Sequence, residues 1–575
     1  MTTRNEPVDM GPVPDIAGSF VTPPGGSAAS DRPANHPNGP TTGISRPAPP
    51  RRRGRRRRRA AGSTALVLVL GLGGCGAGGD GEAAGPSRTA GASPSPTRSY
   101  PLSTAPRTIP AVREHVPARG PGWRPGDGSG VVVARGGGAL ADEARLLARE
   151  LGIEYRGESP ARAGDIELAL GGGGASGVPE SYTLTTRDGR ARITAPDEAG
   201  VFYGTRTVKQ ALRSGGVVPE GVVRDRPDRP QRGLMVDIAR KHFTAAWLED
   251  RIREMADLKL NQLGLHFSDD QAFRIESDSH PEVVSRRHLT KAEVRRLVAL
   301  ARSLHITVVP EIDSPGHLGA VLSAHPSLRL RDARGAVARG AIDIARPESA
   351  RIVDELLREY AQLFPGRYFH VGADEYRALM APDPEASYPR LAAEARDRYG
   401  PGARVRDLAT DWLNDRAATV RAAGKQPKAW NDGILPGGAV TADERVEVEY
   451  WTGREIGARP PVEYLREGRK VVNVNDRYLY YVLGEPNEFT YPTGREIYAS
   501  WTPLVLRGTQ PVPARYSGRI LGGRLAVWCD FANAQTQDRV AAGIRMPLRA
   551  LAQKVWDPRD PSLSWSEFSA LAERL

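Results

Sequence analysis

Two adjacent carboxylic acids, Asp374 and Glu375, stand near the end of the stretch YFHVGADEY at residues 368–376. Most of the residues before them are aromatic or β-branched, which is typical of a buried strand. Like charges side by side at the end of a strand cost stability, so an acid pair there indicates a chemical use. Proton transfer to and from a polar bond is the chemistry that such a pair can perform.

Further acids, histidines and aromatic residues end other segments that are predicted to be strands. They are Asp237, His266, Asp269, Asp270, Asp313, His317, His370, Trp430, Trp451, Tyr478, Trp528 and Asp530. Each alone has an ordinary explanation, because a single Asp is usually a cap or turn and a single Trp is usually core. Acids combined with several aromatic residues are typical of a sugar site, where rings stack on C–H faces and carboxylates bind hydroxyl groups.

The elements that must position these residues alternate between strands and helices. Eight strands are predicted, at residues 233–239, 262–267, 306–312, 367–373, 427–432, 446–451, 470–475 and 524–530. Thr290 and Glu293 form a capping box before one run with helical spacing, and a second run begins at Val405. The pattern predicts a (β/α)8 TIM barrel over residues 226–575, with its site at the carboxyl ends of the strands. A doubly wound open sheet is the alternative, but no Gly-rich phosphate fingerprint follows the first strand.

A small α/β domain is predicted ahead of the barrel, over residues 126–225. Its elements are strands at 130–136 and 165–170, helices at 139–152 and 200–212, and a hairpin turning at Asp188 and Gly189. No titratable residues gather there in a catalytic pattern, so we expect a structural role.

The amino-terminal part predicts export. The chain has 575 residues and a formal charge of +12, but the arginines at residues 51–59 supply eight positive charges, so the charge does not indicate a nucleic-acid partner. A short apolar stretch follows, and LGGC at residues 72–75 resembles a lipobox, with cleavage before Cys75 and a lipid on its thiol. Residues 1–75 are thus predicted as a disordered extension with a lipoprotein signal. A signal anchor, or cleavage without a lipid, are the alternatives.

Residues 76–125 are rich in Gly, Ser, Pro and Thr, which predicts a disordered linker. Cys529 is the only cysteine besides Cys75, so a lipid on Cys75 leaves no disulfide within one chain. We therefore expect a protein that is held by its lipid on the outer face of the cell membrane, or is secreted. The lipid would be its only membrane contact, and the oligomeric state stays open.

Adjacent acids constrain the sugar chemistry. Ordinary retaining glycosidases use two carboxylates about 5 Å apart that flank the glycosidic bond, and neighbours on one strand are poorly placed for this. The difficulty disappears if the substrate's own 2-acetamido group is the nucleophile. One acid then protonates the leaving oxygen, while the other orients the acetamide as an oxazolinium ring closes.

The motif HVGADE resembles the H-x-G-x-D-E signature of glycoside hydrolase family 20, the β-N-acetylhexosaminidases. The segments at residues 232–243, 265–277 and 310–317 resemble other barrel motifs of this family, and AWNDG, EYW, NDRYLYYV and VWCD complete the series. The resemblance covers residues 126–575 and implies the same two domains. It is nearest to the dispersin-like subgroup, which cleaves β-1,6-linked poly-N-acetylglucosamine.

The resemblance implies a role for each matching residue. Glu375 would be the general acid and then the base, and Asp374 would orient the acetamide. Tyr478 would donate to the acetamide oxygen, and Trp430, Trp451 and Trp528 would surround the sugar. Arg232 would bind sugar hydroxyls, with a salt bridge at the barrel mouth as its structural alternative. Asp313 and His317 would form a relay toward Glu375, and Asp269 and His317 would add polar contacts near the substrate. The resemblance implies no cofactor and no metal.

Two positions depart from the family pattern. The family has Trp-x-Glu after the eighth strand, where this chain has Asp530, and Tyr480 stands where many hexosaminidases have Asp. The resemblance implies that residues at both positions contact the outer edge of the terminal sugar. We expect an exo-enzyme that releases terminal β-linked N-acetylglucosamine or N-acetylgalactosamine with retention, since Arg232 would resist a substituted sugar. Release of a disaccharide, as by the lacto-N-biosidases of the family, is the alternative.

Two other classes of protein compete with this assignment. His266, His317 and His370 all end strands, as metal ligands of a hydrolase could, but the first strand offers Asp237 and no histidine. We expect these histidines to make supporting hydrogen bonds. A lipoprotein that only binds amino sugars is the second alternative, but a binder needs no proton donor beside Asp374.

Overall fold

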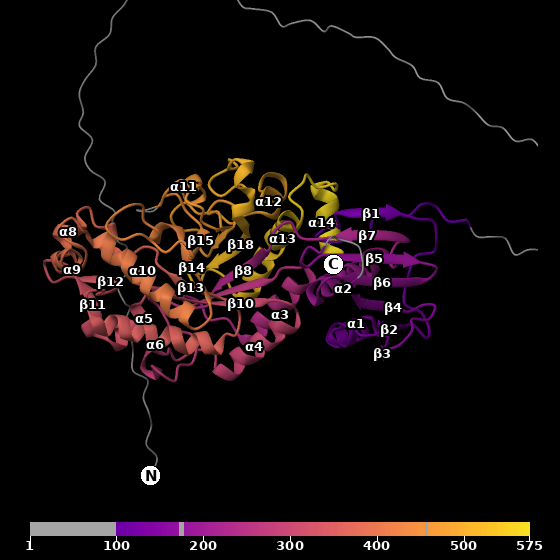
Figure 1. The fold of residues 1–575 in the computed structure, drawn as a ribbon, viewed down its shortest axis with the longest axis horizontal. Helices are drawn as coiled ribbons and strands as arrows, with labels where there is room; N and C mark the ends of the chain where they lie inside the picture. Colours follow the sequence, from indigo (N-terminus) through magenta and orange to yellow (C-terminus); the bar gives the residue numbers. More distant parts are fainter. Residues whose placement is uncertain (1–98, 172–176, 455–457) are drawn as a thin grey trace, which may run out of the picture. The chain divides into compact units, whose positions relative to one another are not determined.

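The computed structural model describes residues 99–171, 177–454 and 458–575. The predicted signal, Cys75 and residues 76–98 of the predicted linker lie outside this part of the chain. Two α/β domains follow one another along the described residues (Figure 1). None of the helices in them is both long enough and apolar enough to cross a membrane.

The first domain is a seven-stranded sheet in the order β1-β7-β5-β6-β4-β2-β3. Its strands are β1 (Glu114–Pro117), β2 (Gly130–Val133), β3 (Glu154–Glu158), β4 (Ile166–Leu170), β5 (Tyr182–Arg187), β6 (Arg190–Ala195) and β7 (Gly221–Asp225). The helices α1 (Ala141–Leu151) and α2 (Glu198–Gly215) pack on these strands. Asp188 and Gly189 form the predicted turn between β5 and β6, and both have positive φ, as a type I′ turn requires.

The predicted linker extends too far toward the carboxyl end, because residues 99–125 belong to this domain. β1 pairs with β7, and the side chains of Ile109 and Trp123 are 1% exposed in the core. Composition alone did not indicate this. The segment is polar overall, and it is held by a few apolar residues and by strand pairing with a partner about 100 residues away in the sequence.

Eight parallel strands close into the predicted TIM barrel (Figure 1). They are β8 (Gln231–Asp237), β9 (Gln262–Ser268), β10 (Thr307–Ser314), β13 (Tyr368–Gly372), β14 (Gln426–Trp430), β15 (Glu447–Tyr450), β16 (Val471–Asn473) and β18 (Ile520–Trp528). β18 closes the ring by pairing with both β8 and β16. The short strand β17 (Tyr480–Val482) is added to the carboxyl half of β18, and β11 (Arg329–Arg331) pairs with β12 (Val337–Ile342) outside the ring. The prediction of the fold is confirmed.

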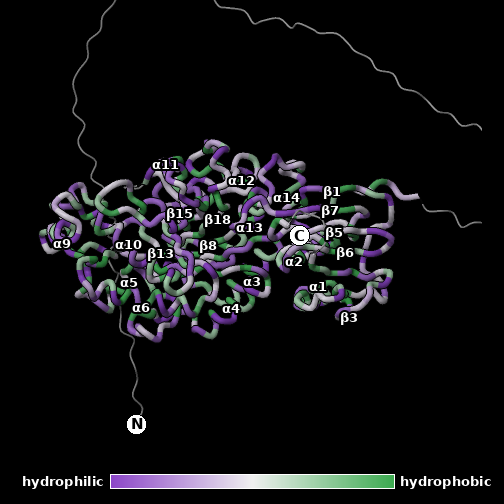
Figure 2. Tube along the Cα trace, viewed as in Figure 1, coloured by the Kyte–Doolittle hydropathy of each residue, from purple (hydrophilic) through white to green (hydrophobic). Residues whose placement is uncertain are grey.

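Helices connect the strands, and two more follow the last strand. They are α3 (Ala245–Asp257), α4 (Lys291–Ser303), α5 (Gly319–Ala324), α6 (Pro347–Leu363), α7 (Arg377–Met380), α8 (Pro384–Ser387), α9 (Pro389–Tyr399), α10 (Val405–Ala422), α11 (Pro461–Arg466), α12 (Gly494–Ser500), α13 (Gln537–Trp556) and α14 (Trp565–Arg574). The capping box at Thr290 is confirmed, since its hydroxyl accepts from the Glu293 amide at 3.2 Å and its amide donates to the Glu293 carboxylate at 2.9 Å. Hydrophobic and hydrophilic stretches alternate along the chain in both domains, as layered packing requires (Figure 2).

Arg232 lies at the amino end of β8 and joins the barrel to the first domain. Its side chain is fully buried and pairs with Glu180 at 2.7 Å, while it donates to the Lys259 carbonyl at 2.9 Å and the Tyr203 hydroxyl at 3.1 Å. The carboxyl end of β8, where Asp237 stands, is the opposite end of the barrel. The prediction that Arg232 binds sugar hydroxyls is therefore wrong, and its salt bridge lies at the other end from the mouth.

Candidate active site

The backbone that presents the acid pair is held in unusual conformations. Ala373 and Glu375, which follow β13, have φ angles of 85° and 48°, and Gly372 has a φ of 72°. Any side chain at Gly372 would meet the Asp313 carboxylate, with a Cβ only 1.6 Å from its Oδ1. That same oxygen accepts from the Ala373 amide at 3.0 Å. Left-handed residues cost about 1–3 kcal/mol each, and such strain is often retained at functional sites.

Asp432 links the acid pair to the aromatic residues. It follows β14, where Oδ2 accepts from the Glu375 amide at 3.2 Å and Oδ1 accepts from the Trp451 indole at 2.9 Å. Burial raises the pKa of its carboxyl well above the usual range, and the charge of Asp374 adds to this. Asp432 was not predicted as a site residue, although its position in AWNDG directly after a strand could have indicated it.

The His317 imidazole lies between the predicted catalytic acids. Its Nε2 is 3.6 Å from Asp374 Oδ2 and 3.6 Å from Glu375 Oε2, and its Nδ1 is 3.3 Å from Asp269 Oδ2. Burial alone would lower the pKa of this imidazole. The carboxylates of Asp269, Asp313 and Asp374 outweigh burial and raise that pKa well above its usual range. His317 is therefore a cation held among acids.

This cation separates the two neighbouring acids. Burial raises the pKa of Glu375, but His317 outweighs burial and holds it below its usual value. Burial raises the pKa of Asp374, opposed by His317 and supported by the charge of Glu375, and the net shift is upward. Burial and Asp374 also raise the pKa of Asp313 well above its usual range, which favours a neutral Asp313 that can donate to Asp374. In this state Glu375 is ionised and must gain a proton before it can act as an acid.

Arg240 is the cation at the mouth that the sequence analysis missed. It follows β8, donates to Asp237 Oδ2 at 3.1 Å and pairs with Asp269 at 2.9 Å. Its guanidinium lies 5.2 Å from the centre of the Trp528 ring. Its position three residues after Asp237, at the carboxyl end of a predicted strand, could have identified Arg240. Arg232 stands at the amino end of the same strand, away from the site.

Carboxylates hold the histidines that end the other strands. His266 lies 2.8 Å from Asp269 and 2.9 Å from Glu311, and His370 lies 3.6 Å from Glu311. Glu311, a buried acid within β10 that was not predicted, also accepts from the Trp430 indole at 2.9 Å.

Two groups here could also hold a metal ion, namely His266 with Glu311 and Asp313, and Asp313 with His317 and Asp374. Each has ligand atoms within 4.8 Å of one another. Their members are already joined by ion pairs and hydrogen bonds in this structure.

The predicted tryptophans come together inside the barrel. Trp430, Trp451 and Trp528 belong to one buried cluster, separate from the main core, with Tyr480 among them. The Trp430 and Trp528 ring centres are 5.8 Å apart, and Trp451 and Tyr480 are stacked at 5.4 Å. Tyr480 thus fills with an aromatic ring a position where many hexosaminidases have an acid.

Tyr478 and Asp530 are less closely joined to the acid pair. Among the described residues, Tyr478 makes no hydrogen bond or ring contact with Asp374 or Glu375, and its ring is covered by Arg477 at 5.5 Å. Asp530 is exposed just after β18. Burial of its carboxyl raises its pKa, and Arg240 opposes that shift.

Comparison with known proteins identifies the family. The model described as "Glycosyl hydrolase family 20, catalytic domain" matches residues 230–559, and "Glycosyl hydrolase family 20, domain 2" matches residues 105–226. The chain belongs to glycosyl hydrolase family 20. The domain 2 match begins at residue 105, within the predicted linker. This agrees with the structure, in which the first domain also begins within that linker.

Relatives of this family 20 chain include two kinds of enzyme. A lacto-N-biosidase of Bifidobacterium bifidum is 29% identical over 82% of this chain and 42% of its own length. A beta-hexosaminidase of Vibrio furnissii is 26% identical over 66% of each chain. The chain thus spans less than two thirds of the length of both.

Solved structures show the same fold. The beta-N-acetylhexosaminidase of Streptomyces coelicolor A3(2) is 23% identical, with a TM-score of 0.66 over 82% of this chain and 96% of its own.

Proposed function

We propose that this protein removes terminal β-linked N-acetylglucosamine or N-acetylgalactosamine from an oligosaccharide or glycoconjugate, with retention and with the substrate's acetamide as nucleophile. One observation is central to the proposal. Asp374 and Glu375 are neighbours that share His317 at 3.6 Å, so both act from the same side rather than across a glycosidic bond. The beta-hexosaminidase relative of Vibrio furnissii supports the amino-sugar class.

The proposed reaction has two steps. In the first, Glu375 gives a proton to the glycosidic oxygen, the bond from C1 to that oxygen breaks, and the acetamide oxygen bonds to C1. Asp374 holds the acetamide N–H and stabilises the positive charge of the oxazolinium ring. In the second, water attacks C1 as Glu375 takes its proton, and the ring opens. Two inversions at C1 give net retention.

The proton for the first step must be brought to Glu375. His317 is charged and lies 3.6 Å from Glu375, and its cation keeps the pKa of Glu375 low. A sugar that displaces water from this site removes solvent from Glu375, which favours its protonated form. His317, held in turn by Asp269 and near Asp313, is the neighbouring proton source, as the predicted relay requires.

Recognition of the sugar is assigned to residues around the acid pair. Trp430, Trp451 and Trp528 supply apolar faces for the ring and the acetamide methyl group. Arg240 takes the role that was expected of Arg232, because it is the guanidinium at the carboxyl end of the strands. Asp530 would bind outer hydroxyl groups. Tyr478 would donate to the acetamide oxygen, which requires it to approach the acids more closely than it does here.

A second candidate function is release of a disaccharide. Tyr480 offers an aromatic face where many hexosaminidases have an acid, and Asp530 is one methylene shorter than the Glu of the family. The shorter Asp530 would leave room beside the terminal sugar, and the Tyr480 ring would offer a second sugar a face to stack on. The argument against a substituted sugar now rests on Arg240 instead of Arg232, whereas the lacto-N-biosidase relative, which matches 82% of this chain, favours the disaccharide.

Replacement of each acid tests the division of labour between them. We expect Glu375→Gln to lower kcat about 10²- to 10⁴-fold on a substrate with a poor leaving group, the usual worth of a general acid. The loss should shrink when the leaving group is a strongly acidic phenol that needs no proton. Asp374→Asn should slow both substrates alike, because it acts on the acetamide.

Steady-state kinetics with a series of aryl β-N-acetylglucosaminides measures this. Thr186→Ser, a conservative change of a buried residue in the first domain, is a matched control that should leave the leaving-group dependence unchanged. Equal losses for Glu375→Gln and Asp374→Asn along the whole series would contradict the proposed roles. Retained activity in both variants would contradict catalysis by this pair altogether.

The choice between one sugar and two can be measured directly. We expect kcat/KM for p-nitrophenyl β-N-acetylglucosaminide to exceed that for the matching lacto-N-bioside. Tyr480→Asp, which restores the acid of many hexosaminidases, should increase this preference further. A clear preference of the unaltered enzyme for the disaccharide substrate would establish the second candidate instead.

Attachment through Cys75 remains a proposal about location. LGGC at residues 72–75 supports a lipid on the outer face of the cell membrane, with secretion as the alternative. Cys75→Ser should move the protein from the membrane fraction to the medium. A variant that stays in the membrane would show that the apolar segment itself is the anchor.

A further inference from the structure

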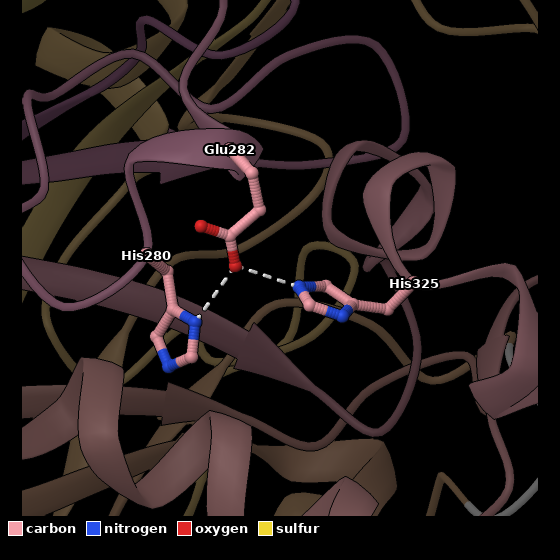
Figure 3. A group of neighbouring side chains, drawn as sticks. All are labelled: His280, Glu282 and His325. Atoms are coloured by element: carbon pink, nitrogen blue, oxygen red, sulfur yellow. Dashed lines mark hydrogen bonds and ion pairs between the residues drawn. The ribbon is translucent and has the colours of Figure 1, made fainter.

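We infer that a zinc-like divalent cation binds to His280, Glu282 and His325, outside the catalytic acids (Figure 3). His280 Nδ1 lies 3.0 Å and His325 Nε2 lies 2.9 Å from the same oxygen, Glu282 Oε1. The ligand atoms of all three lie within 4.8 Å of one another. Imidazole nitrogen and carboxylate oxygen form the set that zinc prefers, at about 2.0–2.2 Å from the metal.

The spacing of the ligands suits such an ion. Tetrahedral zinc with bonds of about 2.1 Å places neighbouring ligand atoms about 3.4 Å apart, so a small outward movement of each side chain would admit it. The side chains are partly open to solvent, at 12% for His280, 29% for His325 and 43% for Glu282. Water can therefore supply the fourth ligand.

A second carboxylate orients one of the histidines as metal sites require. His280 Nε2, the nitrogen facing away from Glu282, lies 2.9 Å from Glu355 Oε2 on α6. Metal-binding histidines usually donate their other N–H in this way, which fixes the tautomer and leaves the first nitrogen free to coordinate.

The loop that holds His280 is itself attached to α6. Glu359, one turn after Glu355, accepts from the Ser277 hydroxyl at 2.7 Å and from the Asp278 amide at 2.7 Å. Burial opposes ionisation of Glu359, but its partners, Lys291 foremost, lower its pKa to about 2. The ligand loop is thus ordered before any ion arrives, which lowers the entropy that binding must overcome.

The ion would connect two segments that also contact each other in the candidate active site. The loop with His280 begins at Asp269, after β9, while His325 follows α5, which begins two residues after His317. Asp269 and His317 are 3.3 Å apart at one end of these segments. A cation at the other end would fix their relative position, and so its role is structural rather than a step in hydrolysis.

Zinc binding by chain purified without an affinity tag and stripped with a chelator tests this. Calorimetric titration with zinc chloride should give one ion per chain, and the melting temperature should rise with zinc. His325→Gln keeps a donor for Glu282 but loses the imidazole, so it should melt like the unaltered protein in chelator and gain nothing from zinc. Glu355→Gln should weaken zinc binding about 10- to 100-fold.

His305→Gln is the matched control. His305 pairs with Glu143 at 2.9 Å without a second histidine, and its replacement should leave zinc binding unchanged. Equal zinc binding by His325→Gln and the unaltered chain would overturn the inference, because the ion would then lie elsewhere, for example among the catalytic acids. No zinc binding by the unaltered chain would show that the cluster is an ion pair only. Both readouts are independent of the proposed activity.

Discussion

The site depends on one largely buried cation, His317, which several acids share. Asp269 contacts one of its nitrogens, and Asp374 and Glu375 share the other. Without a positive charge among them, so many buried carboxyl groups would have to be protonated or would repel one another. Burial and Asp374 raise the pKa of Asp313, while the imidazolium lowers the pKa of Glu375, so that Asp313 favours its neutral form and Glu375 its ionised form. Neighbouring acids after the same strand can thus have different chemical roles.

The barrel supplies the geometry that this charge distribution needs. Asp313 is the last residue but one of β10, and β13 ends in the left-handed turn that leads to the acid pair. The Ala373 amide donates to Asp313. The carboxyl group with the raised pKa therefore also fixes the strained backbone. From His317 the contacts continue through Asp269 to Arg240 and the face of Trp528. Charge and aromatic surface therefore meet at one end of the strands.

Much of this could be predicted from the sequence, because hydrophobic period and strand ends are local signals. The eight strands, the capping box at Thr290 and the turn at Asp188 depend on such signals, as does the grouping of Asp313, His317 and Asp374. The role predicted for Arg232 was wrong because Arg232 and Arg240 lie at opposite ends of β8. Only the direction of that strand decides which of them is at the site. The predicted start of the first domain was wrong because the segment around Trp123 is ordered by residues distant in the sequence. The composition of the segment gives no information about those residues. The position of Tyr478 relative to the acid pair depends on the loop after β16. A loop has no regular hydrophobic period from which that position could be predicted.

The central claim is that Asp374 stabilises a cyclised acetamide rather than a covalent sugar on the enzyme. Inhibition by the thiazoline analogue of N-acetylglucosamine, which mimics the oxazolinium ring, tests this most directly. We expect an inhibition constant at least about 100-fold below that of N-acetylglucosamine itself, as for other analogues of a reaction's high-energy state, and loss of this advantage in Asp374→Asn. An analogue that binds no better than the free sugar, or a sugar trapped on any carboxylate of the protein, would contradict it.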